Sequence, residues 1–277
     1  QGESAPSTGQ LQFLRTIPGV SSIYHKQLQR QVRRATVAEV SPECILGEPL
    51  SDPFVVRENG IRFELSFREG YSIGLFLDQR DNRRRLLVNH VAAGFPAFEE
   101  PVAGKEVLNT FAYTCGFSVC AARAGARTTS LDLSKKYLDW GKRNFRLNRI
   151  EPDNHEFIFG DALNWMTRWN RKKRLFDVVL LDPPTFSQSK ESGIFRVEKD
   201  YGRLVRTALG VLRPGGVLFA STNAATLEPA EFVARVDDAV NRTGRKALQR
   251  FYAPQPPDFP INRAEPGYLK TLWLRVR

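Results

Sequence analysis

The residues best suited to chemistry form the segment Asp182-Pro183-Pro184-Thr185-Phe186, which follows the apolar run 176–181. An acid, two prolines and an aromatic ring at the carboxyl end of a strand make a rigid polar ledge beside a flat apolar face. Proline fixes φ and has no N–H to donate to a neighbouring strand, so the ledge ends the strand. Such a ledge can hold a planar amine or a nucleobase while its edge reacts, although an ordinary strand-to-loop stop can show the same residues.

Two further acids follow apolar runs in the same way, Asp132 and Asp161. In an open α/β sheet, ligands bind beyond the carboxyl ends of the strands, so the three acids are expected to face one crevice. Asp132 comes sixteen residues after Gly116 and is placed to accept hydrogen bonds from two ribose hydroxyls. Asp161 could bond an adenine amine, or it could be a plain helix N-cap.

These acids need a sheet to position them, and the chain alternates between apolar strands and helices from residue 105 onward. Strands are expected at 105–110, 127–131, 155–159, 176–181, 216–221, 245–252 and 269–276. Helices are expected at 116–124, 134–148, 161–170, 198–212 and 228–242. The last two strands are joined only by a Pro-rich loop and should pair antiparallel. The pattern predicts an α/β fold with a seven-stranded, mostly parallel sheet and an antiparallel C-terminal hairpin.

The turn after the first of these strands, Val107 to Ser118, does not read G-x-G-x-x-G. Gly116 is its only glycine, whereas a dinucleotide pyrophosphate needs several glycines for a close backbone approach. The turn therefore disfavours NAD and permits a cofactor without phosphates, such as S-adenosylmethionine.

The N-terminal part is expected to form two smaller pieces, an extension over 1–50 and a β-hairpin and helix module over 51–100, before a catalytic domain at 101–277. A basic helix is expected near 25–34, within otherwise irregular chain over 16–50, and residues 1–15 are expected to lack structure. Asn59-Gly60 between the runs 54–57 and 61–67 indicates a type I′ hairpin. A second basic helix is expected at about 79–94.

The formal net charge of +11 and the pI near 9.8 indicate an acidic partner, with nucleic acid the leading candidate. Three basic clusters, at 25–34, 80–85 and 168–174, together favour a phosphate-binding surface.

Three cysteines cannot form a disulfide framework, and no Cys/His spacing suits a metal, which favours a reducing, cytoplasmic compartment. Cys115 and Cys120 are expected to be free buried thiols. No apolar run is long enough for a membrane span. The chain begins with Gln1, which suggests a trimmed or processed product.

Several motifs together resemble the bacterial large-subunit ribosomal RNA methyltransferases, which are class I, Rossmann-like enzymes dependent on S-adenosylmethionine. The motifs are Gly74 to Arg80, Leu108 to Thr114, Ser134 to Asn148 and Asp182 to Lys190, and the likeness covers about residues 54–277. The greatest similarity is to the guanine-N7 methylating half of the bifunctional enzyme.

The resemblance implies a cofactor site and a catalytic ledge. The cofactor site is expected to consist of Phe76, Gln79, Arg83, Asn109, Phe111, Tyr113, Gly116, Asp132, Leu133, Ser134, Asp161, Ala162 and Asp182. The catalytic residues are expected to be Asp182, Pro183, Phe186 and Asn223.

The sequence departs from the family pattern at two places. Cys115 stands where relatives usually have glycine or another small residue. No N-terminal extension is long enough for a separate RNA-binding domain, so the basic helix near residue 30 is expected to substitute for it.

The residue types also bear on the reaction. Cytosine-C5 methylation needs a cysteine nucleophile, and the stretch Phe219 to Asn223 after the fifth strand has none. A base nitrogen has its own lone pair, and guanine N7 needs no general base at all. In such a transfer Asp182 and the backbone around Pro183 would orient the base, Phe186 would stack on it and Asn223 would bond its edge.

The sequence predicts a methyltransferase with ribosomal RNA as its partner and without a membrane or a metal. A methyltransferase for a protein or a small molecule would keep the same cofactor motifs. A non-catalytic RNA-binding module would explain the charge but not the three acids. A nicotinamide dehydrogenase would need a richer glycine turn.

Overall fold

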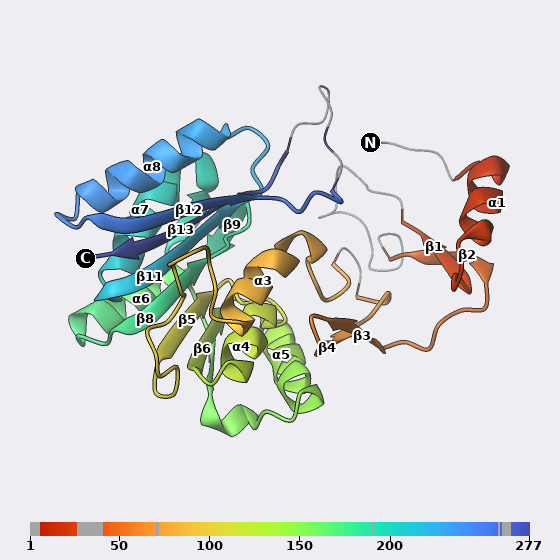
Figure 1. The fold of residues 1–277 in the computed structure, drawn as a ribbon, viewed down its shortest axis with the longest axis horizontal. Coiled ribbons are helices and arrows are strands. Elements are labelled where there is room, and N and C mark those ends of the chain that lie inside the picture. Colours follow the sequence, from red (N-terminus) through yellow and green to blue (C-terminus); the bar gives the residue numbers. More distant parts are fainter. Residues whose placement is uncertain (1–5, 27–40, 70–71, 190, 260, 262–266) are drawn as a thin grey trace. The chain divides into compact units, whose positions relative to one another are not determined.

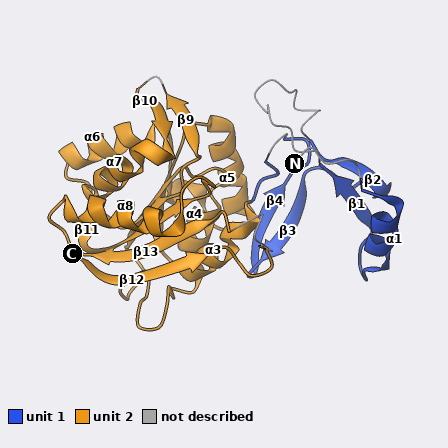
Figure 2. Cartoon of the chain, turned by 90° about the horizontal axis from the view of Figure 1, so that it is seen from above, with its two compact units in different colours: residues 1–75 blue, residues 76–277 orange. Residues whose placement is uncertain are grey.

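The computed structural model describes residues 6–26, 41–69, 72–189, 191–259, 261 and 267–277. The chain divides into two compact units, residues 1–75 and residues 76–277 (Figure 2). The sequence-based boundaries lie instead at 50/51 and 100/101.

Among its described residues, the first unit has the helix α1 and two antiparallel pairs of strands (Figure 1). Its elements are α1 (Thr8–Thr16), β1 (Ser22–His25), β2 (Glu43–Gly47), β3 (Phe54–Glu58) and β4 (Ile61–Leu65). The β3–β4 hairpin confirms the prediction, because Asn59 and Gly60 both adopt positive φ, as a type I′ turn requires.

Two elements of this unit were not expected. The helix α1 begins at Thr8, and its N-cap Ser7 forms a capping box with Gln10. The segment 16–50 was expected to be irregular outside the basic helix, but it contains the strands β1 and β2, which pair antiparallel. The predicted basic helix at 25–34 lies almost wholly outside the described residues.

The second unit is built on a seven-stranded sheet with the order β12-β13-β11-β8-β5-β6-β7. Its strands are β5 (Glu106–Thr110), β6 (Arg127–Asp132), β7 (Glu156–Phe159), β8 (Phe176–Leu181), β11 (Leu212–Thr222), β12 (Ala247–Pro254) and β13 (Lys270–Val276). The strands β7, β6, β5, β8 and β11 run parallel, and β13 pairs antiparallel with both β11 and β12. The predicted fold class is confirmed.

Helices cover both faces of this sheet (Figure 1). They are α3 (Arg80–Leu87) with the preceding 3-10 turn η2 (Leu77–Gln79), α4 (Gly116–Arg123), α5 (Lys135–Leu147), the turn η3 (Pro152–Asn154), α6 (Ala162–Arg171), α7 (Val197–Leu209) and α8 (Pro229–Asn241). On one face α3, α4 and α5 pack together, and on the other α6, α7 and α8 do. The central strands β5, β8 and β11 are buried along most of their length, as strands covered on both faces must be, and β8 and the second half of β11 are mainly apolar.

Two elements of this unit differ from expectation. The basic helix expected to reach residue 94 ends at Leu87, two residues before Asn89, which adopts the left-handed conformation that stops a helix. A short hairpin, β9 (Phe186–Ser189) and β10 (Gly193–Arg196), follows the ledge where no strand was expected.

Candidate active site

The strand order reverses between β5 and β8, which is where an open α/β sheet binds its ligand. In the pairing of these two strands, Thr110 lies opposite Leu181. The loop that begins at Phe111 and the ledge that begins at Asp182 therefore leave the sheet side by side, at its carboxyl edge.

The loop after β5 has an unusual backbone. Phe111, Tyr113 and Cys115 all have positive φ, at 57°, 50° and 63°, although none is glycine. Each such residue costs about 1–2 kcal/mol, so the surrounding structure must hold the loop in place. The one glycine, Gly116, is the first residue of α4 and is not among the residues with positive φ.

Hydrogen bonds hold this strained loop on two sides. The Ala112 amide donates to the carbonyl of Leu131 at 3.0 Å, and the Tyr113 amide donates to Asp132 Oδ2 at 2.8 Å. From α5, the buried Asn144 side chain donates to the carbonyl of Thr114 at 3.0 Å.

Asp132 is half-buried at the end of β6, and both of its oxygens accept backbone N–H groups. Besides Tyr113, the Ser134 amide donates to Asp132 Oδ1 at 2.9 Å. Burial raises the pKa of Asp132, while these backbone hydrogen bonds oppose the rise. Each carboxylate oxygen has a second lone pair, so the fixed carboxylate can still accept a ligand hydroxyl.

Two large apolar side chains at the same edge are exposed to solvent. Leu133 is 40% exposed and Phe159, at the end of β7, is 50% exposed. Leu133 follows Asp132 in the chain, and Phe159 comes two residues before Asp161. A ligand with a flat apolar face and a polar edge would therefore meet apolar side chains and acids at the same place. The sequence-based site included Leu133 but missed Phe159.

Asp161 caps α6, since the Asn164 amide donates to its Oδ1 at 2.8 Å. It also accepts from two serines of the β9–β10 hairpin, Ser189 at 2.8 Å and Ser192 at 2.5 Å. The N-cap interpretation is confirmed, and the hairpin contact was not anticipated. Binding of an adenine amine stays a prediction for this residue.

A buried polar network supports the ledge. Gln79 Nε2 donates to Asp182 Oδ2 at 3.1 Å and to Ser221 Oγ at 2.8 Å. The Gln79 Oε1 accepts from Asn82 Nδ2 at 2.8 Å, and Asn82 Oδ1 accepts from Trp273 Nε1 at 2.9 Å. The turn η2 is thus joined to β8, β11 and β13.

Burial raises the pKa of Asp182 to about 6. The charge of nearby Asp78 raises it further, while hydrogen bonds from Ser221 and Gln79 and the charge of Arg83 lower it. Burial also raises the pKa of Asp78, which accepts a hydrogen bond from the Tyr268 hydroxyl. A carboxyl group that titrates near neutral pH is a common feature of functional sites.

The remaining predicted site residues fall into two groups. Near the ledge, Phe186 is half-buried, Asn223 is exposed, and Pro183 is buried. Phe76 is exposed and packs on Tyr113, with ring centroids 5.2 Å apart. By contrast, some predicted site residues are buried inside the unit: Gln79, Arg83, Asn109 and Ala162. Asn109 donates to Ser118 Oγ at 2.9 Å, so its observed contact is with α4.

Cys115 and Cys120 are buried free thiols, as predicted. Burial raises the pKa of Cys115 to about 12, so the thiolate needed for nucleophilic attack is disfavoured. A methyl group added at Gly141 of α5 would lie 2.3 Å from Cys115 Sγ. Gly141 therefore makes the room that lets a cysteine stand at this position.

The basic cluster at 80–85 is mostly part of the folded core. Arg83 is buried, Arg80 is paired with Asp258, and Arg85 lies over the Phe251 ring at 5.0 Å. Of the four arginines, Arg84 alone is exposed. This cluster therefore offers one exposed arginine, Arg84, to the phosphate-binding surface that the three clusters together are expected to form.

The cluster at 168–174 is exposed but lies at the other edge of the sheet. Arg168, Arg171, Lys172 and Lys173 are exposed at the end of α6 and just after it. Because α6 starts after the carboxyl end of β7 and leads back to the start of β8, its end lies away from the loop and the ledge.

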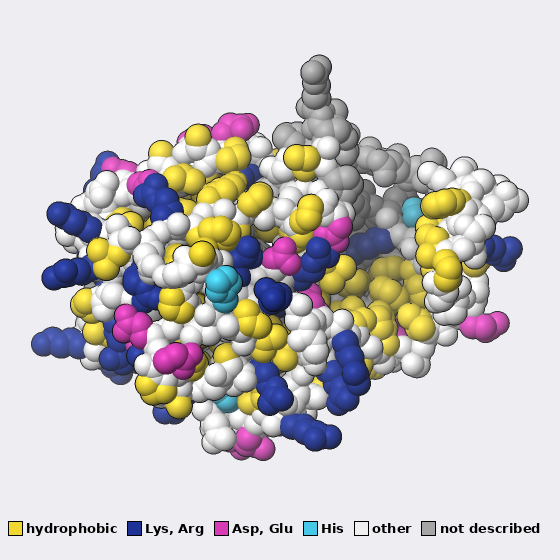
Figure 3. Space-filling model, viewed as in Figure 1, with side chains coloured by type: hydrophobic (Ala, Val, Ile, Leu, Met, Phe, Trp, Pro, Cys, Tyr) yellow, Lys and Arg dark blue, Asp and Glu magenta, His cyan; other side chains and the backbone are white. Residues whose placement is uncertain are grey.

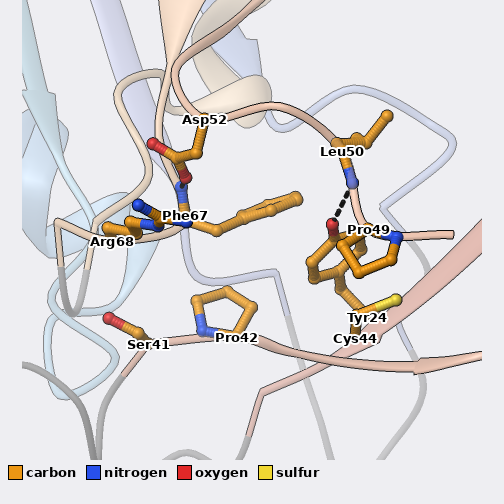
Figure 4. A pocket seen from close by; sticks show the side chains of 9 residues that line it. All are labelled: Tyr24, Ser41, Pro42, Cys44, Pro49, Leu50, Asp52, Phe67 and Arg68. Atoms are coloured by element: carbon orange, nitrogen blue, oxygen red, sulfur yellow. Dashed lines mark hydrogen bonds between the residues drawn. The ribbon is translucent and has the colours of Figure 1, made fainter.

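Residues 1–75 contain a cavity of about 560 Å³ (Figure 4). The Tyr24 and Phe67 rings that line it pack on each other with centroids 4.3 Å apart. Its acid, Asp52, accepts from the Ser66 hydroxyl at 2.6 Å and the Phe67 amide at 2.7 Å. The polar and aromatic groups thus contact one another within this unit.

Among the described residues, no group of three or more His, Cys, Asp or Glu side chains is arranged to hold a metal ion. No helix in the described part of the chain is long and apolar enough to cross a membrane.

Comparison with known proteins decides the family. The profile of the S-adenosylmethionine-dependent methyltransferase family matches residues 7–275. This chain belongs to that family. A solved methyltransferase in complex with S-adenosylhomocysteine (SAH) is 32% identical, with a TM-score of 0.74 over 84% of this chain and 58% of the other. The methyltransferase of Agrobacterium tumefaciens, 20% identical with a TM-score of 0.68, covers 93% of this chain and 77% of its own and shows the fold alone.

Relatives of this chain have names that refer to ribosomal RNA. The ribosomal RNA large subunit methyltransferase of Deinococcus radiodurans is 36% identical over 84% of this chain. The ribosomal RNA large subunit methyltransferase I of Aeromonas salmonicida is 35% identical over 96%, and the K/L enzyme of Pseudomonas fluorescens is 42% identical over 61%. The chain spans 54%, 64% and 20% of the lengths of these three relatives.

The residues of this chain fit the cofactor of the family. Asp132 is fixed and half-buried, and the exposed side chains of Leu133 and Phe159 lie at the same edge of the sheet. A ribose and an adenine together have this pattern of hydroxyls and flat apolar faces. The prediction of S-adenosylmethionine as cofactor is confirmed for the family, and the role of each residue stays a prediction.

Proposed function

We propose that this chain is the catalytic part of an RNA methyltransferase that modifies a base nitrogen of large-subunit ribosomal RNA, with guanine N7 as the favoured atom. The names of the relatives and the net charge of +11 support an RNA substrate.

The observation that carries this proposal is the chemistry of the side chains at the ledge. Asp182 is surrounded by the amide of Gln79 and the hydroxyl of Ser221, with Asn223 two residues farther along the chain. None of the three cysteines belongs to the ledge: Cys44 lies in residues 1–75, and Cys115 and Cys120 are buried in the loop after β5 and in α4. C5 methylation, which needs a thiolate, is disfavoured, and transfer to a nitrogen lone pair requires no such group.

When bound, S-adenosylmethionine supplies an electrophilic methyl group on a sulfonium centre. The residues of this chain would then act mainly by positioning. Asp132 would accept the ribose hydroxyls, and Phe186 would stack on the target base, a contact worth about 1–3 kcal/mol. The Asn223 amide would donate to guanine O6, next to N7. A base within a duplex would have to be flipped out to reach the ledge.

The test is methyl transfer by the purified protein to protein-free large-subunit ribosomal RNA, followed by mass spectrometry of the nucleosides. We expect 7-methylguanosine, and we expect Asp182→Ala and Phe186→Ala to keep cofactor affinity but to lose transfer. Ile194→Ala, an exposed position on the neighbouring hairpin, is the control. Formation of 5-methylcytidine, or of a covalent RNA adduct trapped on a cysteine, would overturn the proposal.

A further inference from the structure

Helix α5 is more positively charged than the helices α7 and α8. Five of its thirteen residues are Lys or Arg, Arg149 follows shortly after its end, and Asp139 is its only acid. By contrast, α7 holds three basic and two acidic residues, and α8 holds one basic and three acidic residues. The end of α6 also exposes basic residues, and of these two basic surfaces α5 is the one that begins at the carboxyl edge of the sheet.

The basic side chains of α5 lie on its solvent face. Figure 3 shows Lys and Arg side chains over the lower part of this unit, where Figure 1 places α5. The opposite face is buried through Leu138, Gly141 and Phe145 among others. We define the α5 basic face by its exposed residues, Lys135, Lys136, Arg143, Arg146 and Arg149.

The single acid of the helix does little to neutralise this face. Asp139 Oδ1 is paired with Lys142 Nζ at 3.0 Å, and Lys142 is half-buried and not part of the α5 basic face. Asp139 is itself exposed, four residues from both Lys135 and Arg143, but the five basic residues outnumber it, and such a positively charged face attracts a polyanion.

The charges in the first turn of α5 are unfavourable for the helix dipole. Lys135 and Lys136 stand at the N-terminal end, where the helix dipole is positive, and this turn contains no acid. Folding favours acids at this place, and the cap is provided by Ser134, whose hydroxyl accepts from the Tyr137 amide at 3.3 Å. Lys135 lies over the Phe159 ring, with Nζ 5.2 Å from its centroid, and departures of this kind from a local rule are expected mainly at functional or strained sites.

The position of the helix connects this face to the site. α5 begins three residues after Asp132 at the carboxyl edge of the sheet and leads back along it. A helix of this length extends about 20 Å, at about 1.5 Å per residue. The α5 basic face therefore starts at the rim of the cofactor crevice and extends far enough to meet several phosphates.

We propose that the α5 basic face binds the phosphate backbone of the RNA that flanks the target base. The proposal rests on the proposed function, in which the substrate is RNA. Phosphate contacts of this kind fix the position of a nucleic acid without reading its sequence. The chain would then hold the strand along α5 while one base lies at the ledge.

The test compares two triple variants of equal charge. Lys136→Gln, Arg143→Gln and Arg146→Gln neutralise the α5 basic face, and glutamine keeps the helix. Arg168→Gln, Arg171→Gln and Lys172→Gln make the same change at the end of α6. The two sets are matched, because Arg143 lies over the Trp140 ring at 5.7 Å and Arg168 over the Trp165 ring at 5.1 Å.

Binding to a fluorescein-labelled RNA hairpin and to protein-free large-subunit ribosomal RNA is measured at several salt concentrations, with cofactor affinity as a folding control. We expect the α5 variant to bind at least about tenfold more weakly, with a salt slope reduced by about 0.7–0.9 for each phosphate that is no longer neutralised. The α6 variant should stay near wild type.

The outcomes separate this inference from the proposed function. If the α5 and α6 variants bind RNA equally well, the inference is overturned, although methyl transfer by the wild type would still support the proposed function. If the wild type neither binds nor methylates RNA while it binds the cofactor, the proposed function fails first.

Discussion

At the scale of single residues, Asp182 is the group at the ledge whose protonation changes near neutral pH. Its pKa is raised to about 6, chiefly by burial, while Gln79 and Ser221 keep it within the network at the ledge. The charged form can only accept hydrogen bonds, and the protonated form can also donate one. The charged form suits an edge of a base that presents N–H donors, and the protonated form also suits an edge that presents acceptors.

The pH dependence of transfer should therefore identify the type of nitrogen. Guanine N7 and O6 are both acceptors, so protonation of Asp182 would not disturb their binding and could add a donor. We expect kcat/KM for transfer to N7 to persist as the pH falls through about 6. Transfer to an exocyclic amine, which needs the charged acceptor, would fall about tenfold per pH unit below that value. Such a fall, absent in Asp182→Asn, would contradict the assignment to N7.

Asp132 is the residue on which cofactor affinity should depend most. Its carboxylate fixes the Tyr113 and Ser134 amides and has lone pairs left for two ribose hydroxyls. Asp132→Ala should weaken S-adenosylmethionine binding by about ten- to a hundredfold, the range expected for hydrogen bonds to a charged group. Titration calorimetry measures this, with the exposed Asp139→Ala as the control. Near-normal affinity with intact folding would refute the ribose role.

At the scale of elements, the loop after β5 and helix α5 form one structural unit. Cys115 occupies a left-handed position in the loop, and Gly141 of α5 leaves just enough space for its sulfur. The Asn144 side chain joins the same helix to the loop carbonyl of Thr114. The geometry of the cofactor loop therefore depends on how closely α5 can approach it.

Gly141→Ala should separate these two elements. The added methyl would overlap Cys115 Sγ, at a cost of about 1–3 kcal/mol, and cofactor affinity should fall with stability. Adding Cys115→Gly should restore much of both, because glycine removes the sulfur and suits the positive φ. Thermal unfolding and cofactor titration measure the effects.

The control for this pair is Gly202→Ala in α7, where a methyl group would meet only the end of the Arg206 side chain, at 3.4 Å. That variant should be neutral or stabilised by up to about 1 kcal/mol, because alanine favours the helix. If Gly141→Ala were also neutral or stabilised, the close approach of Gly141 to Cys115 would not determine the stability of the loop.

Much of the sheet could be predicted from the sequence for a physical reason. Strands covered on both faces are mostly apolar, and the run 176–181, with Asp177 as its one polar residue, shows this directly. The acids at their ends follow from the same runs. The β9–β10 hairpin could not be predicted this way, because its first strand is mostly Ser and Gln and it is stabilised through contacts with distant Asp161.

The strained loop after β5 and the hydrogen-bond network at the ledge also could not be predicted from the sequence. No glycine marks the positive φ of Phe111, Tyr113 or Cys115, and the fit of Cys115 against Gly141 joins residues far apart in the chain. The capping box of α1 was a readable signal, since Ser7 and Gln10 have the spacing that starts a helix. Local sequence patterns thus predict helices and strands, whereas the position of a loop or of a buried arginine depends on packing between distant parts of the chain.

At the scale of the whole molecule, the positive charge is confined to one part of the chain. Residues 1–75 contain eight Lys and Arg residues and eight Asp and Glu residues, so the net charge of +11 belongs entirely to residues 76–277. The basic cluster expected to substitute for an RNA-binding domain, at 25–34, lies in a unit whose acids balance its bases. The binding of phosphates should therefore depend on the second unit.

Neutralising basic residues of the first unit should leave the salt dependence of RNA binding unchanged. The triple variant Arg15→Gln, Arg57→Gln and Arg68→Gln removes as much charge as the α5 variant, from side chains that are exposed. Because the salt slope counts the phosphates neutralised by contact and not the total charge, we expect the wild-type slope within error. Arg68 also lines the cavity of Figure 4, so the variant tests that cavity as an RNA contact. A slope that falls by about 0.7–0.9 per residue would instead place the RNA path over residues 1–75.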